Sequence, residues 1–149
     1  MNSATTSGAK AETDIRALFD AFLSAIRHQQ MDKIMSFYHP VIVAFDAVAQ
    51  LQFKGIKAYG DHWRKCMEMC PGATIFEMQD LDIAATDTLA FAHWLLRCGA
   101  ADQEGNEQTS WMRVTTGLRK IDGTWCIVHE HFSVPFDMES GKALFGLEP

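Results

Sequence analysis

The dipeptide Asp122-Gly123 stands between two long, mostly apolar runs, residues 109–120 and 125–134. Asp-Gly between two such runs is typical of a tight hairpin turn, because both turn positions need a backbone conformation that glycine adopts at little cost. Two further runs, 74–84 and 89–98, precede them and are separated by Thr86-Asp87. The four runs predict an antiparallel meander in the C-terminal half of the chain.

The N-terminal half carries helical patterns instead. From Asp14 to Ile26, apolar residues recur every three or four positions, which predicts an amphipathic helix. A short helix over 31–38 and a third over about 57–69 follow, with short strands at 41–45 and 51–53. Residues 1–12 are small and polar and predict a mobile tail, which leaves 13–149 as a single domain. Helices followed by strands predict an α+β fold, with three N-terminal helices on the concave side of one curved, mainly antiparallel sheet.

The composition and charge of the chain argue against some classes of partner. The 149 residues are 48% hydrophobic and 21% charged and carry a net charge of −6, with thirteen Lys and Arg scattered along the chain. Nucleic acids need a clustered basic surface, so we do not expect one as a partner. The chain has no run of membrane-spanning length and no secretory pattern at its start, so we expect a cytoplasmic protein without a membrane partner.

The last predicted strand carries the candidate site. An alternation of period two from Trp125 places His129, His131 and Ser133 on one face. It places Glu130 on the other face, where we expect a surface or interface residue. Both faces are largely apolar, which predicts a central strand and an enclosed space in front of the two imidazoles. A purely structural role for the two histidines stays open.

The pattern His129-x-His131 is also compatible with a metal-binding site. One face of a strand can offer two imidazoles to one ion, with His93 or Asp46 as the third ligand. No further cluster of acidic residues or histidines completes such a set, so we expect no metal. We also expect the four cysteines to be reduced, because their spacing matches no usual zinc motif.

These features together resemble a known family. Three features resemble the nuclear-transport-factor-two-like superfamily in its SnoaL-like and ketosteroid-isomerase-like branch. They are the order of helices and sheet, the segment from Asp46 to Gly55 that leads into a helix, and the ending Asp-Gly-x-Trp-x-Ile-x-His-x-His-x-Ser. The ending is also similar to the association domain of calcium/calmodulin-dependent protein kinase II. The resemblance implies a cone-shaped fold, a small-molecule pocket, no cofactor, and a homodimer formed through the sheet.

The resemblance also assigns residues to the pocket. Asp46 stands nine residues before Gly55, which matches the position of the isomerase general base, although an aspartate there could equally cap its own turn. The oxyanion-hole tyrosine and aspartate of the isomerases fall on Phe22 and Thr116. Phenylalanine cannot donate a hydrogen bond, so we do not expect standard steroid isomerisation. Positions that support the pocket fall on Tyr38, Trp63, His129, His131 and Ser133.

The sequence therefore predicts a protein that binds a small, mostly apolar organic molecule in a conical pocket, with acid–base chemistry of an isomerase, cyclase or dehydratase kind. Asp46, His129 and His131 are the candidate catalytic residues, and the candidate ligand contacts are Phe22, Tyr38, Trp63, Thr116 and Ser133. A non-enzymatic module for ligand binding or oligomerisation is the open alternative.

Overall fold

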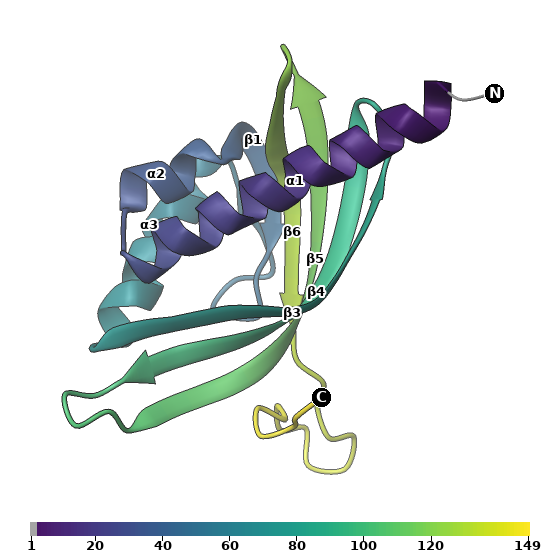
Figure 1. Ribbon diagram of the computed structural model, residues 1–149. Helices are drawn as coiled ribbons and strands as arrows, with labels where there is room; N and C mark the ends of the chain where they lie inside the picture. The colour runs from purple at the N-terminus through teal and green to yellow at the C-terminus, as the bar shows by residue number, and fades with distance from the viewer. Residues whose placement is uncertain (1–2) are drawn as a thin grey trace.

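A computed structural model describes residues 3–149 (Figure 1). Over this range the chain forms the helices α1 (Ser3–Arg27), α2 (Met31–Ser36) and α3 (Ile56–Met69), and the strands β1 (Tyr38–Phe45), β2 (Phe53–Lys54), β3 (Ala73–Ala85), β4 (Leu89–Ala101), β5 (Glu107–Ile121) and β6 (Thr124–Ser133). The predicted α+β class and the order of its elements are confirmed. None of the helices within 3–149 is both long and apolar enough to cross a membrane.

Helix α1 starts much earlier than its apolar pattern suggested. It begins at Ser3, and Ala11 is already buried. Ion pairs one helical turn apart, Lys10–Asp14 and Glu12–Arg16, lie along this first half and favour helix. This corrects the predicted tail, since residues 3–12 are helical; residues 1 and 2 of that tail lie outside the described residues.

The six strands form one sheet in the order β2-β1-β6-β5-β4-β3. Strands β3 to β6 pair antiparallel with their neighbours, as the meander predicted. Strand β1 pairs with β6 in parallel, which places Ala44 beside Glu130 and Phe45 beside His131. This parallel pair joins the first strand of the chain to the last.

The helices cover one face of the sheet, called the inner face here; the opposite face is the outer face. In Figure 1, α1 runs across the curved sheet, and α2 and α3 lie beside β1. Helix α1 buries Ile15, Phe19, Phe22 and Ile26, the spacing that predicted it. Aromatic rings dominate the core, with Phe19 edge-on to Trp94 and Phe22 edge-on to Trp63.

Strand β6 contains an irregularity that changes which side chains face the helices. Gly117 of β5 pairs with His129, but the next residue, Leu118, pairs with Ile127, so Val128 is an extra residue in β6. An extra residue forms a β-bulge and shifts the alternation by one position. Trp125 and Ile127 are buried before the bulge, and Glu130 and Phe132 are buried after it.

The strict alternation predicted for β6 is therefore wrong beyond Val128. His131 is exposed, and His129 and Ser133 are only partly buried, because all three side chains lie on the outer face. Glu130, predicted to be a surface or interface residue, is fully buried.

A pair of charge substitutions checks this placement. We expect His131→Lys to change the free energy of unfolding by less than about 1 kcal/mol, because the side chain is in water. We expect Phe132→Lys to cost several kcal/mol, because it buries an unpaired charge. Urea unfolding of the two variants measures the difference, and equal losses of stability would contradict the assigned faces.

Candidate functional site

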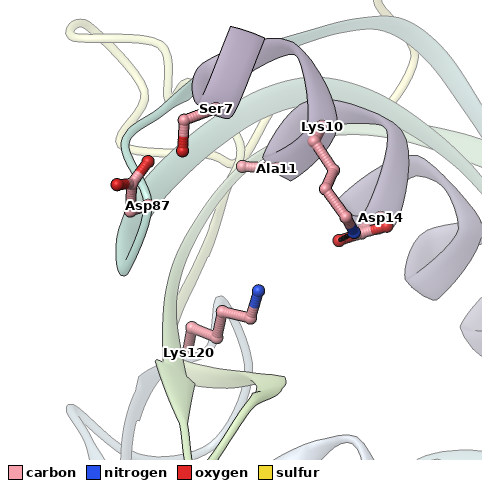
Figure 2. Close-up of a pocket in the computed structure, with 6 residues that line it drawn as sticks. All are labelled: Ser7, Lys10, Ala11, Asp14, Asp87 and Lys120. Carbon is pink, nitrogen blue, oxygen red and sulfur yellow. Dashed lines mark hydrogen bonds and ion pairs between the residues drawn. The ribbon is translucent and has the colours of Figure 1, made fainter. Parts of the chain in front are cut away.

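A small hollow lies beside the start of α1 and is lined by Ser7, Lys10, Ala11, Asp14, Asp87 and Lys120 (Figure 2). Its volume is about 260 Å³. The Lys10 ammonium is already paired with the Asp14 carboxylate at 2.7 Å. Lysine and aspartate charges balance here, and Ala11 is the one apolar side chain in the lining, so this hollow does not suit an apolar molecule.

A larger hollow, called the Asp46 cleft here, has a volume of about 550 Å³. It lies where β1 ends and residues 46–52 loop back toward β2, and its lining is Phe45, Asp46, Gln50, Leu51, Gln52 and His131. Phe45 and His131 come from the paired strands β1 and β6. The cleft therefore reaches Asp46 from the end of strand β1, and buried side chains fill the interior behind it.

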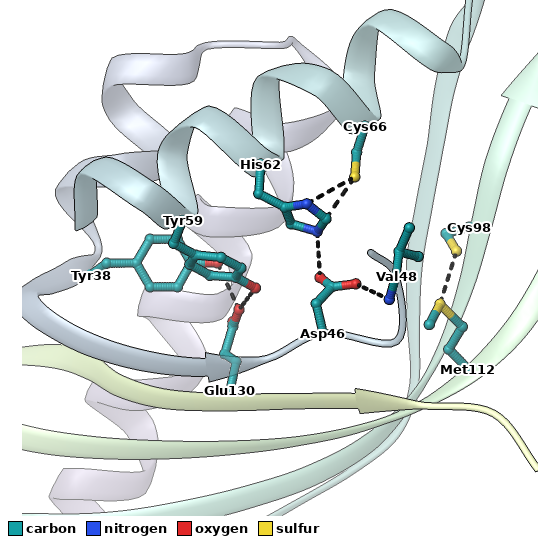
Figure 3. A network of polar contacts seen from close by, with 9 residues as sticks. All are labelled: Tyr38, Asp46, Val48, Tyr59, His62, Cys66, Cys98, Met112 and Glu130. Atoms are coloured by element: carbon teal, nitrogen blue, oxygen red, sulfur yellow. Dashed lines mark hydrogen bonds and ion pairs between the residues drawn. The ribbon is translucent and has the colours of Figure 1, made fainter. Parts of the chain in front are cut away.

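Asp46 links this cleft to the interior. Its Oδ1 accepts a hydrogen bond from the Val48 backbone amide at 3.0 Å, and its Oδ2 lies 3.2 Å from Nε2 of His62 (Figure 3). The Asp46 side chain is 16% exposed and that of His62 only 6%. One oxygen therefore caps the turn, as one of the two interpretations of Asp46 predicted, and the other pairs with an imidazole.

His62 is held firmly in place on the buried face of α3. Its ring stacks on Phe53, with ring centroids 4.2 Å apart. The Cys66 Sγ, one helical turn further along, lies 3.6 Å from the same Nε2 atom that faces Asp46. Burial raises the pKa of the Cys66 thiol to about 11, so the sulfur is neutral near pH 7 and is not an activated nucleophile. The arrangement suits proton transfer through Asp46 and His62, and it does not suit covalent catalysis.

Glu130 and two tyrosines form a second polar group beside Asp46. The Tyr38 and Tyr59 hydroxyls donate hydrogen bonds of 2.8 and 2.9 Å to the same carboxyl oxygen of Glu130, Oε2 (Figure 3). Burial raises the pKa of Glu130 to about 8, although the two hydrogen bonds act in the opposite direction. The nearby charge of Asp46 raises it further. Glu130 is therefore mainly a neutral carboxylic acid at pH 7.

The same buried environment also changes the pKa of the two tyrosines. Burial, and then the negative charge that Glu130 can carry, raise the pKa of both Tyr38 and Tyr59 well above the ordinary value. Both hydroxyls keep their protons and act as hydrogen-bond donors. The buried group is thus a set of neutral donors next to one ionisable pair, Asp46 and His62.

Four of the predicted ligand contacts lie in the core between the helices and the inner face of the sheet. Phe22 and Thr116 are fully buried, and Tyr38 and Trp63 nearly so. The Phe22 ring contacts Tyr38 and Trp63 edge-on, with centroids 5.7 and 6.3 Å apart. The Thr116 hydroxyl accepts a hydrogen bond from Trp94 Nε1 at 3.3 Å. The structure thus gathers these residues around the polar groups under α3.

The other predicted residues on β6 do not join them. The ring of His129 uses Nδ1 to donate a hydrogen bond to the Val43 carbonyl at 2.6 Å, which ties β6 to β1. Ser133 accepts a hydrogen bond from Arg113 on the outer face. His131 lies against Phe45 and borders the Asp46 cleft from outside. The bulge at Val128 is the physical reason for all three placements.

Sequence reasoning missed three site residues: Tyr59, His62 and Glu130. Tyr59 and His62 carried a usable signal, because both lie with Trp63 on the apolar face of the amphipathic helix α3. Glu130 carried none, since an acidic residue at an outward strand position is ordinary, and the bulge that turns it inward has no mark in the sequence. Among the described residues, no group of three or more His, Cys, Asp or Glu could hold a metal ion.

The buried carboxyl group predicts a specific pH dependence of stability. The pKa of Glu130 is about 8 in the folded protein against 4.5 for an ordinary glutamate, so folding favours the protonated form. The stabilisation is complete below pH 4.5 and is lost as the pH rises to about 8, at roughly 1.4 kcal/mol per unit of pKa difference. Between pH 5 and 8.5 the wild type should lose several kcal/mol more than Glu130→Gln in urea unfolding. Parallel stability curves for the two proteins would contradict it.

Comparison with known proteins places this geometry in a family. A family model for the SnoaL-like domain matches residues 15–137. The crystal structure of an NTF2-like protein of unknown function from Pseudomonas putida KT2440 is 46% identical, with 95% of this chain and 98% of that chain covered and a TM-score of 0.88. No functionally curated protein is significantly similar in sequence.

More distant structures share the fold alone. The association domain of C. elegans CaMKII has a TM-score of 0.69 at 17% identity, over 85% of this chain and 98% of that one. A candidate scytalone dehydratase from Novosphingobium aromaticivorans DSM 12444 has a TM-score of 0.76 at 10% identity, over 89% of each chain. The match over residues 15–137 and the close relative from P. putida decide the family: the chain belongs to the SnoaL-like family of NTF2-like proteins.

Proposed function

We propose that the protein binds a small, mostly apolar organic molecule and moves a proton at a carbon next to a carbonyl group. The observation that carries this proposal is the contact of 3.2 Å between Asp46 and His62 at the inner end of the Asp46 cleft. A partly exposed carboxylate that is backed by a buried imidazole can take a proton from a molecule in the cleft. The proposed chemistry is that of an isomerase, cyclase or dehydratase and needs no cofactor.

Each predicted residue has a place in this proposal. Asp46 is the base that touches the ligand, and His62 positions its carboxylate and stabilises the charge. His131 contacts the ligand at the outer rim of the cleft, together with the apolar side chains of Phe45 and Leu51. His129 and Ser133 have structural roles on the outer face. The inner residues form the apolar wall behind the reacting group: Phe22, Tyr38, Trp63 and Thr116.

Hydrogen–deuterium exchange at the α-carbons of 2-tetralone, an apolar bicyclic ketone, tests the proposal by proton NMR in D₂O. The wild type should accelerate exchange, and Asp46→Asn should slow the enzymatic rate by about 100-fold or more. His62→Gln should lower the rate, and His131→Ala should mainly weaken saturation by the ketone. Asp61→Asn is the matched control, because this carboxylate lies on the exposed side of α3 and pairs with Lys57 and Arg64. Unchanged rates in both Asp46→Asn and His62→Gln would refute the proton-transfer function.

A homodimer formed through the outer face is a second proposal, and it is compatible with the first. The outer face exposes large apolar side chains, with Leu89 and Phe91 each 54% and Phe45 38% accessible. Exposed apolar residues gathered on one face of a sheet favour association with another protein surface. A purely oligomeric module, like the kinase association domains that share the fold, would use the same face.

Light scattering on the purified protein checks this second proposal. The wild type should have the mass of a dimer, and Phe91→Glu should have the mass of a monomer, because the substitution would bury a charge at the interface. Met69→Glu is the control, since Met69 is 79% exposed at the end of α3, on a helix and not on the outer face of the sheet. A monomeric wild type would contradict the dimer, and a much larger ring would favour the oligomeric module.

A further inference from the structure

Two buried polar atoms near the Asp46–His62 pair lack hydrogen-bond partners in the described part of the chain. They are Oε1 of Glu130 and Nε1 of Trp63; the indole nitrogen of Trp125 is a third such atom, on β6 before the bulge. Buried polar atoms in native proteins almost always have a partner, and an orphan atom at a functional site often marks a missing ligand or water. Oε1 of Glu130 on β6 and Nε1 of Trp63 on α3 therefore both need a binding partner.

Both orphan atoms belong to residues that lie beside Tyr59. Its hydroxyl donates to Oε2 of Glu130 at 2.9 Å. Trp63 follows one helical turn later on α3, with its ring centroid 6.3 Å from that of Tyr59. The indole N–H is near enough to the Tyr59 hydroxyl to favour its ionised form, but it makes no hydrogen bond with it. Both atoms thus lack a partner within the described part of the protein, and both are closed off from the Asp46 cleft in this structure. A ligand in the cleft reaches them only when the side chains between the cleft and Glu130 move.

The hydrogen bonds around Glu130 also decide which oxygen carries its proton. The Tyr38 and Tyr59 hydroxyls both donate to Oε2, so the proton of the neutral acid belongs on Oε1. Oε1 is then a hydrogen-bond donor, as Trp63 Nε1 always is. Two donors without acceptors fit an acceptor such as a carbonyl oxygen.

Distances along the sheet fit the same interpretation. Glu130 pairs with Ala44, and Asp46 lies two residues further along on the same face, roughly 7 Å away by strand rise. In Figure 3 both carboxyl groups extend from the sheet toward α3. A ketone whose oxygen contacts Oε1 and whose α-hydrogen contacts Asp46, each at about 3 Å, spans a comparable length.

We propose that the carboxylic acid of Glu130 and the indole N–H of Trp63 together bind the carbonyl oxygen of the ligand from which Asp46 removes a proton. The inference rests on the proposed function and adds the group that binds the oxygen. The C–H bond breaks, its electrons form a C=C bond, the C=O π electrons move to oxygen, and the proton goes to Asp46. The two donors stabilise the enolate oxygen, and return of the proton to carbon completes the cycle without an oxidant or reductant.

This oxygen site replaces the one that the sequence comparison found missing. Phe22 and Thr116 occupy the positions of the isomerase donors: Phe22 is a hydrocarbon and cannot donate, and the Thr116 hydroxyl accepts a hydrogen bond from Trp94. A neutral acid in an apolar site can serve as an oxyanion donor, as it does in ketosteroid isomerase. In this chain the acid is Glu130 on β6, whereas the isomerase position falls on Thr116 of β5.

The test uses Asp46→Asn protein, which should hold 2-tetralone without converting it, and 2-tetralone labelled with ¹³C at the carbonyl. A donated hydrogen bond should move the carbonyl resonance of the bound ketone downfield at pH 6.5. The groups that face Glu130 are Tyr38, Tyr59 and residue 46, with His62 behind, and the tyrosines keep their protons throughout. The downfield shift should therefore decrease as Glu130 ionises, near or somewhat below pH 8, because the Asp46→Asn substitution removes a charge that raises the pKa of Glu130.

Two further variants complete the experiment. Adding Glu130→Gln should make the shift independent of pH, because the amide keeps an N–H donor at every pH. In an otherwise wild-type protein, Trp63→Phe should slow α-carbon exchange by about 100-fold through loss of one donor. Circular dichroism and urea unfolding confirm that each variant is folded.

The outcomes separate this inference from the proposed function. A carbonyl shift that is the same at every pH, with or without Glu130→Gln, overturns the inference, while Asp46-dependent exchange would leave the proposed function intact. Exchange that is unaffected by both Asp46→Asn and His62→Gln overturns the proposed function, although a pH-dependent carbonyl shift would still support the oxygen-binding site. No resonance of bound ketone at any pH overturns the inference as well.

Discussion

The parallel pairing of β1 with β6 is the contact on which the rest of the site depends. The two strands are far apart in the sequence, yet the pairing places Ala44 beside Glu130 and brings Asp46 next to the same stretch of sheet. Helix α3 then covers this junction and supplies Tyr59, His62 and Trp63 from one face. Without that pairing, the acidic residues of the two strands would have no common environment.

The junction places two acidic groups in different surroundings. Asp46 lies at the edge of a cleft, with one oxygen on a backbone amide and the other on an imidazole. Glu130 is sealed in the interior among aromatic rings, where desolvation outweighs two hydrogen bonds and holds the carboxyl group neutral near pH 7. A base, the proposed role of Asp46, beside a neutral donor is what proton transfer at a carbonyl compound requires. The contrast comes from depth of burial.

Membership of the SnoaL-like family and the NTF2-like fold does not determine the chemistry, which depends on the side chains of the site. The distant structures that share the fold include an association domain and a candidate dehydratase, so the fold by itself selects neither function. In this chain the inner face carries the polar groups and the outer face carries exposed apolar ones. The proposed catalysis and the proposed association would therefore use opposite faces of the same sheet.

Local sequence patterns determined the fold to a large extent. The spacing of Ile15, Phe19, Phe22 and Ile26 predicted the buried stripe of α1, and Asp122-Gly123 predicted the β5–β6 hairpin, because helices and hairpins depend on interactions between near neighbours. The sequence also predicted that Asp46 lies at the end of a strand. The resemblance to the family predicted inward positions for Phe22, Tyr38, Trp63 and Thr116.

Only the tertiary structure decided the inner polar group. Period-two alternation placed His129, His131 and Ser133 in the pocket and Glu130 outside, and one extra residue at Val128 reversed all four. A bulge depends on how a strand fits its neighbours on both sides, so one strand's sequence does not reveal it. The pairing of Asp46 with His62, and of Glu130 with two tyrosines, likewise depends on contacts between segments that are distant in the chain. The sequence by itself determined the elements and the position of Asp46; tertiary packing decided which side chains surround it.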